Sequence, residues 1–259
     1  QRDIAANKLN IRITSHTDRR EAVKGARYVL NVVRIGGLEA FEHDINIPLT
    51  YGVDQCVGDT LGPGGIFYAQ RVIPFVLDLC ADIRELAEPD CLLLNYSNPM
   101  AMVTWAATKY GGVRTVGLCH GVQHGVQLFA KLFKVAYEDL DIVCAGINHQ
   151  TWYIGIQHEG RDLTGKLLEA FEAEPYYLGR EKVRVDMLRR FGYFSTESNG
   201  HLSEYLPWYR KDSESLKKWI SDEGWALGRT GGYLWKCHET RNEFDEKFEE
   251  WMSEPAKSY

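Results

Sequence analysis

The chain has 259 residues, of which 44% are hydrophobic and 25% are charged, and its formal net charge is −6. These values are typical of a globular protein and exclude the clustered basic excess that nucleic-acid binding requires. No apolar run reaches the roughly 18 residues of a membrane-spanning helix, so we expect no membrane partner. Six cysteines without a Cys-x-x-Cys spacing favour reduced thiols, a cytoplasmic location and no structural zinc site.

The first part of the chain alternates short hydrophobic strands with helices. A helix over residues 19–24 precedes a predicted buried strand over 28–35, and apolar residues at helical spacing predict a helix over 66–88. The alternation continues with strands at 91–95, 113–118, 143–147 and 152–157, and with helices at 99–110 and 123–135. This pattern predicts βαβ units and a parallel sheet.

Beyond about residue 160, helices dominate the predicted structure, at 160–175, 180–191, 213–220 and 239–252. We therefore expect an α/β fold: a partial, Rossmann-like domain of the nucleotide-binding type in residues 1–147 and a partial, mainly helical domain in residues 148–259. The Gly-x-Gly-x-x-Gly loop that normally follows the first strand of such a sheet is absent. The first strand and this loop are therefore expected to be missing.

Two short motifs place metal-binding side chains at the ends of predicted strands. Cys119 and His120 follow the strand at 113–118, and His149 follows the strand at 143–147. Ligands of open α/β sheets bind at the carboxyl ends of strands, and a thiolate with an imidazole suits a borderline divalent cation. We expect Cys119 and His149 to share one cation, although two unrelated core residues are the ordinary alternative. His120 should point to the opposite face, which suits an acid–base role better.

Three other polar features are candidates for a ligand site. Asn98, before Pro99 at a strand-to-helix turn, can bond a hydroxyl or a metal-bound oxygen, or simply cap the helix. The Gly-rich loop 59–65, expected to precede the helix at 66, can turn backbone amides toward phosphate or sugar. A polar and aromatic cluster at 197–209 suits carbohydrate, or else packs between helices.

At these positions the chain resembles glycoside hydrolase family 4, the NAD- and Mn²⁺-dependent glycosidases. The matching stretches occur in the family's order, at 35–37, 59–65, 95–100, 117–120, 145–149 and 191–208. The patterns Asp-Thr-Leu-Gly-Pro-Gly-Gly at 59–65 and Ser-x-x-His-x-x-Glu-Tyr-x-Pro-Trp at 198–208 are most similar to the α-galactosidase branch. His120 stands where the 6-phospho-glycosidase branches commonly have Asp, which favours an unphosphorylated sugar.

The resemblance implies hydrolysis of an α-galactoside or a related α-glycoside. In this reaction NAD oxidises C3 of the sugar, a base removes the C2 proton and the leaving group is eliminated, and a divalent metal assists these steps. It implies Cys119 and His149 as metal ligands, Asn98 and His149 at the substrate, and His120 as the acid that assists the leaving group. The base at C2 is open among Tyr205, His201 and Glu197. The implied cofactor contacts are Gly36, Gly37, Asp59 and Asn95.

Compared with the family, the chain lacks the N-terminal Gly-rich loop and roughly the last third of a typical member. It is therefore expected to be a fragment that binds NAD weakly or not at all, and the intact protein is expected to be a homo-oligomer. Two alternatives stay open at this point. One is an NAD-dependent 2-hydroxyacid dehydrogenase of the lactate/malate type, which shares the sheet, and the other is an inactive fragment of the glycosidase.

Overall fold

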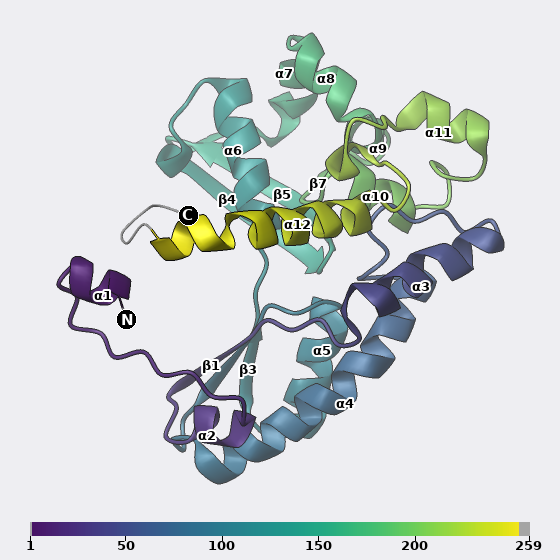
Figure 1. Cartoon of the computed structure of the whole chain (residues 1–259). Helices are drawn as coiled ribbons and strands as arrows, with labels where there is room; N and C mark the ends of the chain where they lie inside the picture. Colours follow the sequence, from purple (N-terminus) through teal and green to yellow (C-terminus); the bar gives the residue numbers. More distant parts are fainter. Residues whose placement is uncertain (1, 254–259) are drawn as a thin grey trace.

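The structure is a computed structural model that describes residues 2–253, and its lower part contains a parallel sheet (Figure 1). The strands β1 (Tyr28–Asn31), β2 (Leu92–Asn95) and β3 (Arg114–Gly117) pair in this order. Asn31 lies in register with Asn95, and its Nδ2 donates to Asn95 Oδ1 over 2.9 Å. The predicted parallel sheet is therefore confirmed, although the first strand is shorter than residues 28–35.

The long helix α4 (Gly62–Leu86) packs against this sheet because its apolar side chains fall on one face. Two buried side chains of that face, Val72 and Val76, belong to the same hydrophobic core as Leu93 of β2. The other helices of this part are α1 (Arg2–Ala6), α2 (Arg19–Val23), α3 (Gly37–Thr50) and α5 (Met100–Ala106), which continues as a π-helical turn (Ala107–Gly111).

Two expectations for this part need correction. Helix α3 was not predicted, because Gly36 and Gly37 were interpreted only as the end of a strand; in the structure Gly36 is the N-cap of α3. Helix α4 begins at Gly62 rather than at 66, so the glycines at 64 and 65 lie in its first turns and not in a free loop.

A second sheet is antiparallel and forms the centre of the upper part (Figure 1). Strand β5 (Gln150–His158) pairs with β4 (Leu140–Ile147), β6 (Arg161–Asp162) and β7 (Phe194–Ser195). The prediction that all strands continue one parallel sheet is therefore wrong here. Ile147 pairs with Gln150, which leaves only a tight turn between β4 and β5, whereas parallel neighbours need a crossover of a dozen or more residues.

Helices cover this second sheet, as expected for the second half of the chain. The core beneath them contains Phe129, Tyr153, Phe171 and Phe194, all almost fully buried. The helices are α6 (Gly121–Phe133), α7 (Leu167–Glu172), α8 (Pro175–Arg180), α9 (Lys182–Phe191), α10 (Asn199–Tyr205) and α11 (Ser213–Trp219), with short 3₁₀ turns at Tyr137–Asp139, Thr164–Lys166 and Trp225–Leu227. Of these helices, α8 and α10 were not predicted.

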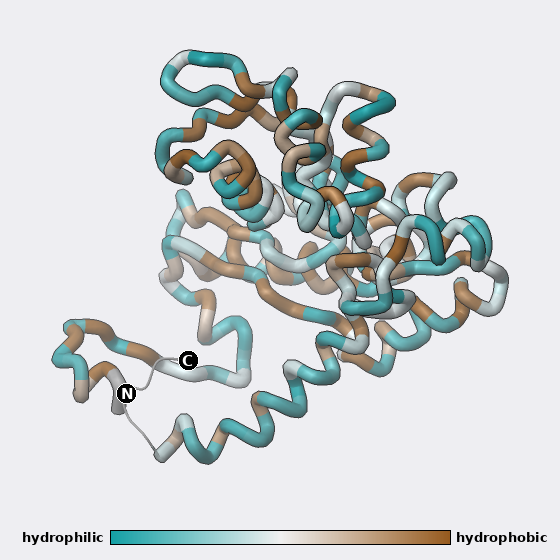
Figure 2. Tube along the Cα trace, turned by 90° about the horizontal axis from the view of Figure 1, so that it is seen from above, coloured by the Kyte–Doolittle hydropathy of each residue, from teal (hydrophilic) through white to brown (hydrophobic). Residues whose placement is uncertain are grey.

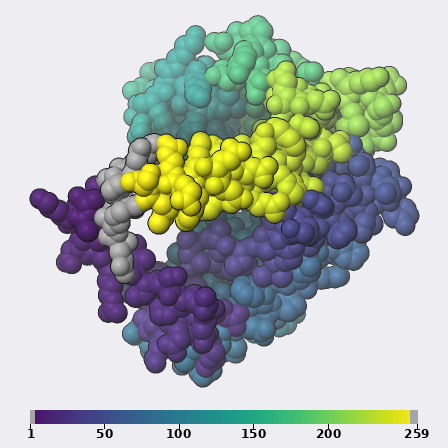
Figure 3. Space-filling model, in the orientation of Figure 1, coloured from purple at the N-terminus to yellow at the C-terminus, as the bar shows by residue number. Residues whose placement is uncertain are grey.

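The last helix, α12 (Gly232–Ser253), lies across the boundary between the two parts (Figure 3). Figure 2 shows it as mostly hydrophilic, and Gly232 is its single buried residue among those described. Within residues 2–253, no helix combines the length and the apolar character needed to cross a bilayer. Since β4 pairs with β5, we propose that the domain boundary lies before Leu140 rather than after Ile147.

Candidate metal centre

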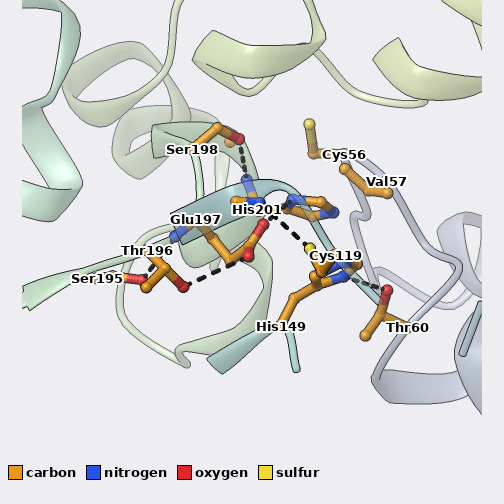
Figure 4. Close-up of polar contacts among 12 residues, drawn as sticks. Cys56, Val57, Thr60, Cys119, His149, Ser195, Thr196, Glu197, Ser198 and His201 are labelled. Atoms are coloured by element: carbon orange, nitrogen blue, oxygen red, sulfur yellow. Dashed lines mark hydrogen bonds and ion pairs between the residues drawn. The ribbon is translucent and has the colours of Figure 1, made fainter. Parts of the chain in front are cut away.

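Three potential ligands from separate segments converge in the upper part of the molecule. Cys119 follows β3, His149 lies in the turn between β4 and β5, and Glu197 follows β7. One ligand atom of each lies within 4.8 Å of the others, and Figure 4 shows the three side chains facing one another. The structure thus brings together Cys119 and His149 as expected and adds the Glu197 carboxylate, which sequence reasoning had placed among the candidate bases.

Gly121, the first residue of α6, makes this approach possible. A Cβ on Gly121 would lie 2.7 Å from Glu197 Oε1, so any other residue would crowd the carboxylate, while Cys119 Sγ would lie in ordinary contact at 3.6 Å. The Gly121 N–H also donates to Cys119 Sγ over 3.4 Å. Burial, followed by the charge of Glu197, raises the pKa of the Cys119 thiol, and a bound divalent cation favours the thiolate instead.

The orientation of the His149 ring is set by Thr60 and Asp59. Thr60 Oγ1 donates to Asp59 Oδ1 over 2.9 Å and lies 2.9 Å from His149 Nδ1. Because the one hydroxyl proton goes to Asp59, Nδ1–H donates to Thr60 and the lone pair of Nε2 is left for a cation. Burial, with the neighbouring His201, lowers the pKa of His149 to about 4, so its ring is neutral near pH 7.

Replacing Thr60 by valine should weaken metal binding without unfolding the protein. Valine keeps the shape of the side chain but removes the hydrogen-bond partner of His149, and losing such a contact behind a ligand reduces metal affinity by about 10- to 100-fold. Titration calorimetry with Mn²⁺ measures this change. Thr60→Ser, which keeps the hydroxyl, should bind nearly as well as the unmodified protein; equal affinities for all three proteins would contradict the role of Thr60.

Asp59 is fully buried and accepts hydrogen bonds from two further side chains. Arg34 Nη2 donates to Oδ2 over 2.9 Å, and Asn98 Nδ2 lies 3.2 and 3.1 Å from the two carboxylate oxygens. Asp59 was expected to contact the cofactor directly, but its side chain is fully buried and offers no surface for such a contact. Asp59 instead orients Asn98 on one side and, through Thr60, the imidazole of His149 on the other.

The second buried pair of the site joins Glu197 to His201. His201 Nδ1 lies 2.9 Å from Glu197 Oε2, and both side chains are buried. Burial opposes ionisation of both groups, but their hydrogen bond and mutual attraction outweigh it, so the pKa of Glu197 is lowered and that of His201 is raised. The pair therefore favours an ionised carboxylate beside Cys119.

Tyr205 lies behind His201, and their rings stack with centroids 5.7 Å apart. Glu197 and His201 line the cavity at this site, whereas Tyr205 is not among its lining residues in the described part of the chain. Burial raises the pKa of Tyr205 well above its usual value, which disfavours a phenolate base. Of the three candidate bases, the structure brings only Glu197 and His201 to the cavity.

The cavity has a volume of about 440 Å³ and also exposes Asn98 and His120. His120 lies on the same cavity as Cys119, contrary to the expected opposite face, because both residues follow the end of β3 at Gly117 and His120 is the N-cap of α6. The Tyr96 hydroxyl hydrogen-bonds to His120 Nδ1. The His120 ring is therefore held at the cavity but outside the group of three ligands.

Not all of the residues expected to contact the cofactor are accessible to a ligand. Asn95 is fully buried and donates to Ser97 O and Thr104 Oγ1, so its side chain is not available to a ligand. Gly36 and Gly37 adopt positive φ angles of 90° and 63° at the start of α3, beyond the carboxyl end of β1. Uncapped backbone amides at such a helix start favour an anionic group.

Two family models match the chain consecutively. Residues 1–135 match family 4 glycosyl hydrolase, and residues 144–258 match its C-terminal domain. The chain belongs to glycosyl hydrolase family 4. This assignment confirms the family resemblance found in the sequence and leaves the dehydrogenase alternative without support.

Among curated relatives, an alpha-galactosidase of Rhizobium meliloti (strain 1021) is 54% identical over 99% of this chain and 52% of its own length. The chain spans about half the length of the curated relatives it matches. A putative glucosidase of Bacillus subtilis has a similar structure, with a TM-score of 0.73 and 26% identity over 89% of this chain and 57% of that one.

A 6-phospho-beta glucosidase from Thermotoga maritima, solved with manganese, NAD⁺ and glucose-6-phosphate, has a TM-score of 0.73 over 95% of this chain and 55% of that one. At 23% identity, this likeness supports the fold alone.

The residues of this chain fit a divalent cation better than they fit a dinucleotide. For the cation there are a sulfur, a neutral imidazole and a carboxylate oxygen within 4.8 Å, and a hydrogen-bonded partner orients the imidazole. For the dinucleotide there are the carboxyl ends of β1–β3 and the start of α3, but no Gly-x-Gly-x-x-Gly sequence.

Proposed function

We propose that this chain carries the metal and sugar site of a family 4 α-glycosidase that acts on an unphosphorylated α-galactoside with NAD and Mn²⁺. The observation that carries the proposal is the convergence of Cys119, His149 and Glu197 on one cavity that also exposes Asn98 and His120. The 54% identity to an alpha-galactosidase supports the choice of sugar. When bound, NAD⁺ supplies a hydride acceptor for C3 of the sugar, and the cation supplies a Lewis acid at the C2 and C3 oxygens.

The chain's own residues would hold the sugar and manage its protons. Asn98, fixed by Asp59, offers its amide oxygen to a sugar hydroxyl beside the cation. Glu197 and His201, joined over 2.9 Å, form the pair best placed to receive the C2 proton. If Glu197 binds the cation, His201 is the remaining candidate base at the cavity, because Tyr205 does not line it.

His120 suits the role of the acid that protonates the leaving group. When the Tyr96 hydroxyl donates to Nδ1, the neutral ring carries its proton on Nε2. Nε2–H is then the donor available to the glycosidic oxygen, since the ring lines the cavity. His120 and the candidate base are separate groups, as elimination requires: one gives a proton to the departing oxygen and the other removes the proton from C2.

The proposed reaction predicts exchange at C2. An aryl α-galactoside that carries deuterium at C2 should lose the label to solvent during hydrolysis in the presence of NAD⁺ and Mn²⁺, because the C2 hydrogen leaves as a proton. Mass spectrometry of the released sugar measures the label. Full retention of deuterium in a hydrolysed product would exclude the elimination route, and NADH accumulation with a hydroxy acid would favour a dehydrogenase.

The inactive-fragment alternative has its own test. Calorimetry of this chain with Mn²⁺ and with NAD⁺ should give heat for Mn²⁺ at the least, because the three ligands are present. No heat with either would leave an inactive fragment. We keep the homo-oligomer and the cytoplasmic location as proposals; all six cysteines are free, in agreement with a reducing environment.

A further inference from the structure

The loop over residues 55–60, which carries Thr60, packs tightly against the first turns of α4. A Cβ on Gly64 would lie 2.2 Å from Gly58 O, and a Cβ on Gly65 would lie 2.5 Å from the carbonyl carbon of Thr60. Only glycines at these two positions leave room for the loop backbone. Gly58 itself has a φ of +63°, a left-handed conformation that favours glycine.

The opposite side of this loop is bound by helix α10, which comes from the other half of the sequence. The Glu204 carboxylate accepts three successive backbone N–H groups of the loop: Cys56 and Val57 at 2.6 Å each and Gly58 at 2.9 Å. A Cβ on Gly200 would lie 2.9 Å from Cys56 Sγ, so the helix also lies directly on the loop. The loop is thus held between α4 and α10.

A carboxylate is suited to this contact because it only accepts hydrogen bonds and has room for several donors. A glutamine in its place would turn an NH₂ group toward at least one of these backbone N–H groups. Two donors would then face each other inside the protein, and a buried N–H without a partner is unfavourable. The loop would move until this conflict is relieved.

We propose that Glu204 is a positioning residue of the candidate metal centre, because it fixes the loop from which Thr60 holds the His149 ring. This inference rests on the proposed function of the centre. The same helix carries His201, which holds Glu197 over 2.9 Å. Helix α10 therefore orients two of the three ligands, one through its own side chain and one through the loop.

The test uses Co²⁺ as a coloured substitute for the native cation in the full chain. Glu204→Gln should reduce Co²⁺ affinity by about 10- to 100-fold and change the visible absorption of the bound cobalt, since the geometry of the His149 ligand changes. Glu169→Gln, at an exposed position of α7, is the matched control and should leave both unchanged. Unchanged affinity and spectrum in Glu204→Gln would overturn the inference.

A second control separates positioning from general destabilisation. Asp186 accepts a hydrogen bond from the Tyr209 hydroxyl over 2.8 Å, so Asp186→Asn should lower Tm without changing the cobalt spectrum. If circular dichroism shows that Glu204→Gln does not fold, Glu204→Asp is the variant to test, because it keeps the negative charge on a shorter side chain. Glu204→Asp should bind Co²⁺ more weakly than the unmodified chain. Equal binding would overturn the inference.

Failure of the inference can be told apart from failure of the proposed function. If Cys119→Ser loses Co²⁺ while Glu204→Gln binds it normally, only the role of Glu204 is wrong. If Cys119→Ser binds Co²⁺ as tightly as the unmodified chain, the metal centre itself is wrong.

Discussion

If the proposed function holds, Cys119→Ser should abolish the metal-dependent activity while the fold persists. The hydroxyl of serine stays protonated at neutral pH and is a poor ligand, whereas the cysteine sulfur can bind a divalent cation as a thiolate. Loss of the several kcal/mol that a Lewis-acid metal contributes corresponds to a fall in kcat/KM of about 1,000-fold or more. Hydrolysis of an aryl α-galactoside with NAD⁺ and excess Mn²⁺ measures this fall.

The control for this prediction is a cysteine outside the site. Cys144 lies in β4 and is not one of the three grouped ligands, so Cys144→Ser should keep most of the activity. Both variants should give the circular dichroism of the unmodified chain, because Cys119 is only half-buried. Near-normal turnover of Cys119→Ser at saturating Mn²⁺ would refute its role as a ligand.

Asp59→Asn should produce the largest loss of stability among single substitutions near the site. Its carboxylate is fully buried and accepts from Arg34, Thr60 and Asn98. Removing one partner of a buried ion pair typically costs 3–5 kcal/mol; because Arg34 is about one-fifth exposed, we expect about 3 kcal/mol. For a chain of this size, that loss lowers Tm by about 6–12 °C.

Thermal unfolding followed by circular dichroism tests this value. Asp78→Asn, at an exposed position of α4, is the matched control and should change stability by no more than about 0.5 kcal/mol. Asp59→Asn should also weaken Mn²⁺ binding, since asparagine keeps only one acceptor oxygen, for which Thr60 then competes with Arg34 and Asn98. A loss below about 1 kcal/mol would show that Asp59 does not organise the site as described.

The parallel sheet could be predicted because short hydrophobic runs, such as those that include 28–31 and 92–95, have a direct local signal. The antiparallel hairpin was misjudged because strand direction depends on the connection, and the turn at 148–149 is too short for a crossover. Helix α3 was hidden by the glycines at its start and by Pro48 within it. Local patterns therefore predicted elements better than they predicted their pairing.

The metal centre could also be predicted only in part from the sequence. Cys119 and His149 follow hydrophobic strands, which is a recognisable signal, and they do lie together. Glu197 was not predicted as a ligand because the strand before it, β7, is only two residues long. Thr60 contacts His149, which lies 89 positions away in the sequence, and Glu204 contacts the loop backbone 146–148 positions away. No short-range sequence pattern encodes contacts between residues so far apart in the chain.

The most direct test of the account is to locate the cation itself. Crystals of this chain soaked with Mn²⁺ should give one anomalous difference peak between Cys119 Sγ, His149 Nε2 and a Glu197 carboxylate oxygen, and the peak should vanish in Cys119→Ser. A peak elsewhere, or none at a Mn²⁺ concentration that saturates binding in solution, would contradict a shared cation at this site.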